Sequence, residues 1–272
     1  KTEANGKTAV DIKAINASSS RTDVYGVMVG LLAASGTNYS QMHNQSHATV
    51  NFDGGNSVTS PIIVDSLNVQ AISNHRMKAK AEGHGGGVIN ISPYAAKIFY
   101  NKDSEDVATT SVNVTGAIQA DNGISFKSQN VDNINMQADS SGNVGIFVGA
   151  TGTGIDSASV RTANTILDNA SLTTVGQGGR IALEAENIVN INRLETKEKG
   201  DKDPDYGNAN TDFMLQAASF TFFLDTDVGD AEIKIRDTAN VEVKNNSNIA
   251  SAGDLILNAH SSDNVGASTY VS

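Results

Sequence analysis

Apolar and polar positions alternate in short runs along the chain, and one such run recurs at a constant interval. Its copies occupy residues 10–14, 67–71, 124–128 and 181–185, so that they begin at positions 10, 67, 124 and 181. A fifth copy begins at position 255, whereas the same interval would place it at position 238. Alternation of this kind is typical of a strand with one buried face. A constant 57-residue period predicts an architecture of stacked units.

A finer spacing divides the period into thirds. The runs that begin at Val10 and Leu67 are separated by two further alternating runs, which begin at Val29 and Ala48. About 19 residues would supply the two or three short strands of one rung of a β-helix, whose rungs pair in parallel about 4.8 Å apart. We therefore predict an all-β chain that forms a parallel β-helix, with rungs of ~19 residues and a higher 57-residue repeat.

The composition of the segments between these runs favours turns over helices. No long stretch places apolar residues at positions i, i+3, i+4 and i+7, and Asn, Ser, Thr, Asp and Gly separate the short β-branched runs. An antiparallel β-sandwich is the alternative with the same kind of composition, but nothing in that fold requires a 57-residue period. We expect residues 1–272 to form a single β-helix segment.

The period also predicts which side chains lie inside. Five residues occupy the third position of each recurring run and are expected to stack in one column or in adjacent columns. They are Ile12, Val69, Phe126, Leu183 and Leu257.

Charge and composition exclude several classes of function. The net charge of −11 disfavours binding to nucleic acid, which requires basic patches. The absence of cysteine excludes disulfides and thiolate metal sites. No run of 18 apolar residues is present, so that no transmembrane helix is expected.

A charged stretch, residues 196–212, interrupts the alternation and accounts for the late start of the fifth copy. We interpret it as an inserted acidic loop. Four of its aspartates have the spacing of positions 1, 3, 5 and 12 of a calcium-binding loop, and they are Asp201, Asp203, Asp205 and Asp212. Tyr206 stands where such a loop needs glycine. A solvated loop balanced by Lys197, Lys199 and Lys202 is the alternative to a calcium site.

Two tripeptides raise the question of an enzyme. Gly-His-Gly at residues 83–85 and Asn-Thr-Asp at 210–212 resemble short motifs of polygalacturonases, which are β-helical enzymes. The two motifs stand in the reverse order, and the adjacent Asp pair that would supply two carboxylates for glycoside hydrolysis is missing. His43 and His47 share one face of a strand, but two ligands do not make a metal site. We expect no enzymatic activity and keep a polysaccharide lyase or hydrolase as the alternative.

Several recurring segments together resemble a family of exported proteins. Glycine-flanked apolar strands stand at residues 25–30 and 142–149, and Thr/Ser-Val-Asn strands at 48–52 and 110–114. A small-residue turn leads into an alternating strand at residues 248–259. These elements resemble the repeats of leukotoxin-family filamentous adhesins, the class that includes filamentous haemagglutinin-like proteins. The resemblance covers nearly the whole chain apart from residues 196–212.

The resemblance implies a fold, a route of export and a role. Its fold is a right-handed parallel β-helix, and its members are secreted with a partner transporter, in two-partner secretion, to act in adhesion or as a surface stalk. We therefore expect a structural rod segment of a secreted bacterial surface adhesin that presents loops for attachment. It would be either an internal segment or a mature fragment, located outside the cell or on its surface. The expected partners are a receptor or glycan on a host or neighbouring cell, and other copies through end-to-end association. A calcium-stabilised binding module is the further alternative.

Overall fold

The computed structural model describes residues 7–100, 108–191, 215–220, 224–266 and 269–271. The described residues form strands, bends and turns, and they contain no helix. The strands are β1 (Ala9–Val29), β2 (Ala33–Ser35), β3 (Asn38–Asn44), β4 (Ala48–Asp53), β5 (Ile62–Tyr100), β6 (Ala108–Thr174), β7 (Arg180–Ile191), β8 (Leu215–Phe220), β9 (Leu224–Lys244), β10 (Asn248–Ala250), β11 (Leu255–Val265) and β12 (Thr269–Val271). The chain is therefore all-β, as its sequence predicts.

These strands belong to one hydrogen-bonded sheet, whose main path runs β1-β5-β6-β7-β11. The pairing along this path is parallel. It joins Val10 to Leu67, Leu67 to Ile124, Ile124 to Ile181 and Ile181 to Leu255. The paired residues are the first residues of the five recurring runs, so the alternation in the sequence and the register of the sheet coincide.

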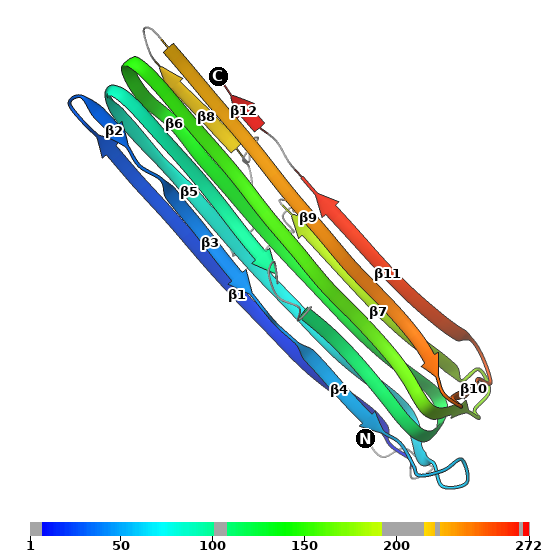
Figure 1. The fold of residues 1–272 in the computed structure, drawn as a ribbon. Helices are drawn as coiled ribbons and strands as arrows, with labels where there is room; N and C mark the ends of the chain where they lie inside the picture. Colours follow the sequence, from blue (N-terminus) through cyan, green and yellow to red (C-terminus); the bar gives the residue numbers. More distant parts are fainter. Residues whose placement is uncertain (1–6, 101–107, 192–214, 221–223, 267–268, 272) are drawn as a thin grey trace, which may run out of the picture.

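The chain passes along the molecule and back again within each period (Figure 1). An outgoing strand such as β1 ends in a bend, and β2, β3 and β4 then return along the molecule. In β5 and β6, outgoing and return runs follow one another within a single long strand. Outgoing runs pair with outgoing runs and return runs pair with return runs, as in the pairing of β3 with β5 and of β6 with β9.

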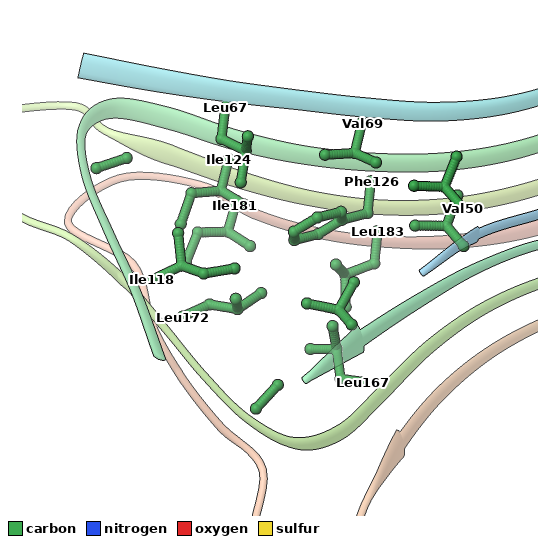
Figure 2. Close-up of a cluster of buried hydrophobic side chains, with 14 of the residues drawn as sticks. Val50, Leu67, Val69, Ile118, Ile124, Phe126, Leu167, Leu172, Ile181 and Leu183 are labelled. Carbon is green, nitrogen blue, oxygen red and sulfur yellow. The ribbon is translucent and has the colours of Figure 1, made fainter. Parts of the chain in front are cut away.

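The apolar core lies between the outgoing and return runs. Its main cluster combines outgoing residues, among them Val69 and Leu183, with return residues such as Val50 and Leu167 (Figure 2). Phe126 lies fully buried in this cluster and contacts the ring of Phe52 at a centroid distance of 6.2 Å. Removing these side chains from water stabilises the fold by roughly 1.5–3 kcal/mol for each fully buried large residue.

The five residues predicted to point inward pair in one column, as the period requires. Val69, Phe126 and Leu183 are fully buried, and Ile12 is partly buried against the main cluster. Leu257 is 54% exposed. The difference has a simple cause, because β11 ends the main path and, among the described residues, no further strand pairs with its outer edge to cover its inner side chains.

The prediction that one rung takes a third of a period is wrong. Rungs of that length would place Val29 directly over Val10, but Val10 pairs with Leu67 and Val29 is 81% exposed. The finer spacing instead divides one period into the beginning of β1, the bend after it, and the return strand β4 that faces the beginning of β1. An outgoing strand of 21 residues spans about 70 Å, whereas five strands side by side span only about 20–25 Å.

The register changes where the sequence predicts an inserted loop. The offset between paired residues is 57 at Ile134 and Ile191, and it becomes 77 at Ala138 and Leu215. The additional residues therefore fall between Ile191 and Leu215. Residues 196–212 themselves lie outside the described part of the chain, and the inserted loop stays a prediction.

Candidate functional site

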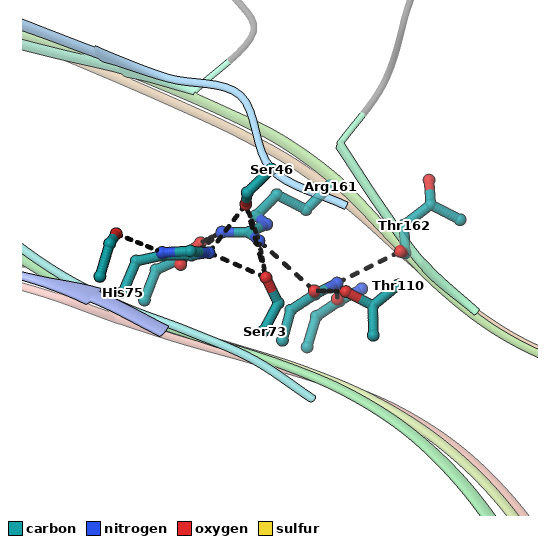
Figure 3. A network of polar contacts seen from close by, with 10 residues as sticks. Ser46, Ser73, His75, Thr110, Arg161 and Thr162 are labelled. Carbon is teal, nitrogen blue, oxygen red and sulfur yellow. Dashed lines mark hydrogen bonds and ion pairs between the residues drawn. The ribbon is translucent and has the colours of Figure 1, made fainter. Parts of the chain in front are cut away.

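A cluster of polar side chains lies in the interior between the outgoing and return runs, and we call it the polar layer (Figure 3). At its centre Arg161 of β6 forms an ion pair with Asp132, and both side chains are fully buried. Nη2 of Arg161 also donates to Oγ of Ser73, at 3.0 Å. Taking two charges out of water costs several kcal/mol for each ion, so that each depends on the other for compensation.

His75 is held in the polar layer by three hydroxyl groups. Its Nε2 lies 2.7 Å from Oγ of Ser46 and 2.8 Å from Oγ of Ser73, and its Nδ1 lies 2.6 Å from Oγ of Ser18. Burial, followed by the positive charge of Arg161, lowers the pKa of His75 to about 4. The imidazole is therefore neutral at pH 7 and adds no second positive charge beside the guanidinium group.

Asparagine side chains extend the polar layer and connect the two sets of runs. Nδ2 of Asn130 donates to Oδ1 of Asn187 at 2.6 Å and to the backbone oxygen of Thr162 at 3.2 Å. Nδ2 of Asn187 donates in turn to the backbone oxygen of Thr238 at 2.7 Å. Since Asn130 and Asn187 lie on outgoing runs and the backbone acceptors on return runs, these bonds hold the facing layers together in a defined position.

A further carboxyl group lies at the margin of the polar layer. Asp237 of β9 is the register partner of Arg161. Burial raises the pKa of Asp237 to about 7, and the negative charges of Asp263 and Asp132 contribute, outweighing the opposite effect of Arg161. Asp237 therefore changes its charge near neutral pH.

The contacts of the polar layer favour a structural role over catalysis. Both ring nitrogens of His75 lie within hydrogen-bond distance of hydroxyl groups, and the carboxylate of Asp132 is paired with Arg161. Two hollows of the described surface are lined by other residues, one around Gly123 and Arg180, the other by residues 158–160 and 233–236. Neither hollow includes a residue of the polar layer in its lining.

Sequence reasoning missed the polar layer, although the period contains a signal for it. The column that contains Asn130 also contains Asn16, Ser73 and Asn187, each one period apart. Inward positions that are polar in four successive periods predict a buried hydrogen-bonded layer. Arg161 could not be found in this way, because it reaches the layer from a return run.

The candidate calcium ligands Asp201, Asp203, Asp205 and Asp212 lie outside the described residues, and so does the Asn-Thr-Asp motif. Within the described ranges, no group of three or more His, Asp or Glu side chains is placed to hold a metal ion.

Three histidines that the sequence singled out are placed by the structure. His84 of the Gly-His-Gly motif packs edge-on against the ring of Tyr25, with centroids 5.9 Å apart. His43 contacts the side chain of Gln41. Nδ1 of His47 accepts from the backbone amide of Thr109, at 3.3 Å. Each of these histidines therefore contacts at least one neighbouring group.

Asparagine ladders run across the outer surface. Nδ2 of Asn190 donates to Oδ1 of Asn133 at 3.0 Å, and Nδ2 of Asn264 donates to Oδ1 of Asn190 at 3.0 Å. The three residues occupy the same position in successive periods. Side-chain amides stacked in this way add hydrogen bonds parallel to the backbone ladder.

Comparison with protein-family models, with curated proteins and with solved structures found no match. Since the described residues include no helix, they include none that could span a membrane.

Proposed function

We propose that the chain is a segment of the shaft of a secreted bacterial surface adhesin, built as a right-handed parallel β-helix. One observation carries the proposal: five strands pair in parallel, and each contributes the same position of the period to a common column. Such a body can be lengthened by adding periods without any change in the packing of those already present.

The two edges of the sheet support this interpretation. β1 and β11 end the main path, and the inner side chains of β11 at Leu255 and Leu257 are about half exposed. A further period, from the same polypeptide or from another copy, would cover these side chains and pair the free backbone edge. Charged and amide side chains lie on the outer face of the outgoing runs, among them Lys13, Asn68 and Lys127.

A shaft of this kind would present a distant binding region to a receptor or glycan on a host or neighbouring cell. Export with a partner transporter and a location outside the cell or on its surface belong to the same proposal. They come from the resemblance of the repeats to filamentous adhesins. The buried, mutually paired groups of the polar layer fit a structural part better than a site that acts on polysaccharide.

Deleting one period tests the shaft. Removal of residues 67–123 joins Ser66 to Ile124, which stands in the same column as Leu67. The shortened protein should keep its β-type circular dichroism and melt cooperatively at a reduced temperature. Deleting only residues 67–85, about one third of the period, is the matched control and should abolish folding. Equal tolerance of both deletions would contradict the proposal.

Adhesion is tested on beads that carry the protein. The shaft alone should confer little attachment to cells and should not depolymerise polygalacturonate. Release of unsaturated or reducing sugar ends from that polymer would overturn the proposed role and support the enzymatic alternative.

A further inference from the structure

Exposed apolar side chains gather where outgoing runs turn into return runs, at the end of the molecule marked by β2 in Figure 1. In the first period they include Leu31, which is 90% exposed, and Leu32, which is 74% exposed. In the third period they include Ile146 and Phe147, each about half exposed. We call these four residues together with Val29 the apolar bend.

Backbone contacts bring the members of the apolar bend together. The amide of Gly30 donates to the oxygen of Gly86 at 2.9 Å, and the amide of Ile89 donates to the oxygen of Leu32 at 3.0 Å. Gly86 in turn pairs with Val144. The bend of the second period thus lies between those of the first and third, and its Ile89 is also exposed, at 40%.

The interior near this end is closely packed around Gly83. A Cβ atom added at Gly83 would lie 2.1 Å from the backbone oxygen of Gly26 and 2.7 Å from the ring of Tyr94. Along β1 the small residue Gly26 is flanked by the exposed side chains of Tyr25 and Val27. Apolar side chains therefore lie on the outer face of β1 near the bend.

The sequence around the bends carries no formal charge. Residues 24–52, 83–96 and 140–155 contain no Asp, Glu, Lys or Arg, although the whole chain has a net charge of −11. An uncharged, apolar surface of this extent on a polar body marks a site of interaction. The absence of charge removes the cost of desolvating ionised groups when the surface enters an apolar medium.

The position and the charge of this surface favour a lipid bilayer as its partner. The apolar bend lies where the chain reverses direction at one end of the molecule, and the two described hollows are lined by residues from other parts of the chain. A lipid bilayer accepts exposed apolar side chains because its acyl chains adapt to them, and interfacial segments enter it by about 5–10 Å. The acidic body would be repelled by anionic headgroups, so that an electrically neutral bilayer is favoured.

We propose that the apolar bend binds the surface of a lipid bilayer with zwitterionic headgroups. The inference rests on the geometry and composition of the bends and does not depend on the chain being a shaft. Val29, Leu31 and Leu32 would enter the interface from the first period, and Ile146 and Phe147 from the third.

Tryptophan fluorescence tests the contact directly, because the chain contains no tryptophan. The Leu31→Trp variant is mixed with phosphatidylcholine vesicles, and its emission should shift to shorter wavelength while the protein floats with the vesicles. The matched control is Val58→Trp, since Val58 is 70% exposed in the loop at the opposite end. Its emission should not change. Failure of the Leu31→Trp variant to shift and to float would overturn the proposal.

A charged pair of substitutions separates lipid binding from other uses of the surface. The Leu31→Asp/Leu32→Asp double variant should bind phosphatidylcholine vesicles at least tenfold more weakly and should keep its melting temperature, because both side chains are exposed. The Val58→Asp/Val175→Asp control should bind like the unmodified chain. If light scattering without vesicles reveals a dimer that only the Leu31→Asp/Leu32→Asp variant dissociates, the apolar bend is an interface between two copies and the lipid proposal is wrong.

Discussion

The apolar cluster and the polar layer occupy the same interior, between the same strands, but they are built on different rules. In the apolar cluster each period contributes an equivalent side chain, so that Val69, Phe126 and Leu183 stack on one another. In the polar layer one column also contains unlike groups. His75 and Asp132 share a column, and Asp132 finds its countercharge in Arg161 on a return run.

This difference shows how a repetitive chain obtains a unique register. Stacked aliphatic residues stabilise many alignments almost equally, because one aliphatic side chain can replace another at little cost. A buried ion pair tolerates only the alignment that brings the two charges together. We infer that the apolar cluster supplies most of the stability and that the polar layer fixes the alignment of outgoing and return runs.

The largest effect of a substitution on stability is expected in the apolar cluster. Leu183→Asp places a lone carboxylate in a fully buried position and should reduce the free energy of unfolding by about 5 kcal/mol or abolish folding. Leu257→Asp lies in the same column on the exposed edge strand and should change it by less than about 1 kcal/mol. Chemical denaturation of both variants measures the contrast, and equal effects would mean that the column does not run inside.

The polar layer should respond almost as strongly to the loss of one charge. Arg161→Met removes the countercharge of the buried Asp132 and should lower the free energy of unfolding by about 3–5 kcal/mol. The double variant Arg161→Met/Asp132→Leu should recover a large part of this loss, because no lone charge remains. A double variant as unstable as the sum of the two single variants would show that the two groups act independently.

A smaller, pH-dependent effect is expected at Asp237. Since its pKa is raised to about 7 in the folded chain, folding favours the protonated form, and stability is lost as the pH rises from 3.8 towards 7. Asp132 and Asp263 repel the ionised form and Arg161 attracts it. Because the side chain is partly exposed, Asp237→Asn should stabilise the protein by only about 1–2 kcal/mol at pH 8, and by almost nothing at pH 4.

Thermal unfolding across this pH range measures the effect at Asp237. The exposed Asp230 on the same strand supplies the control variant Asp230→Asn, which should show no such dependence. If the difference in melting temperature between Asp237→Asn and the unmodified chain stays constant from pH 4 to pH 8, Asp237 is not the source of the pH dependence.

The smallest effect is expected on the outer surface. Asn190→Ala interrupts the ladder from Asn133 to Asn264 and should cost about 0.5–1.5 kcal/mol, the usual net value of a hydrogen bond. Asn258→Ala, at an exposed asparagine of β11, is the matched control. If Asn190→Ala lowered the free energy of unfolding as much as Arg161→Met does, the outer ladders, and not the polar layer, would fix the alignment of outgoing and return runs.

The apolar alternation predicted the strands and their register, but the polar layer and the path of the chain within a period were missed. The alternation at Leu67, Ile124 and Ile181 gave the strand class, the parallel register and the inward column, because these follow from side-chain period alone. It did not give the path of the chain within one period. The finer spacing within the period is compatible with a short rung and also with part of a long outgoing or return run. Only the pairing of the strands distinguishes the two arrangements. The ion pair of Arg161 could not be predicted for the same reason, since its partner Asp132 is 29 residues away in the sequence and lies on a facing run.

The distance between Asp11 and Val29 tests this account most directly. Both residues lie on the unbroken strand β1, near its two ends, and both side chains are exposed. Because the chain has no cysteine, Asp11→Cys and Val29→Cys provide two unique sites for spin labels. Pulsed dipolar spectroscopy should give a separation of about 60 Å, the length of an unbroken outgoing strand. A separation of about 15 Å or less, a few strand spacings, would show that the chain turns after every third of the period and would contradict the account.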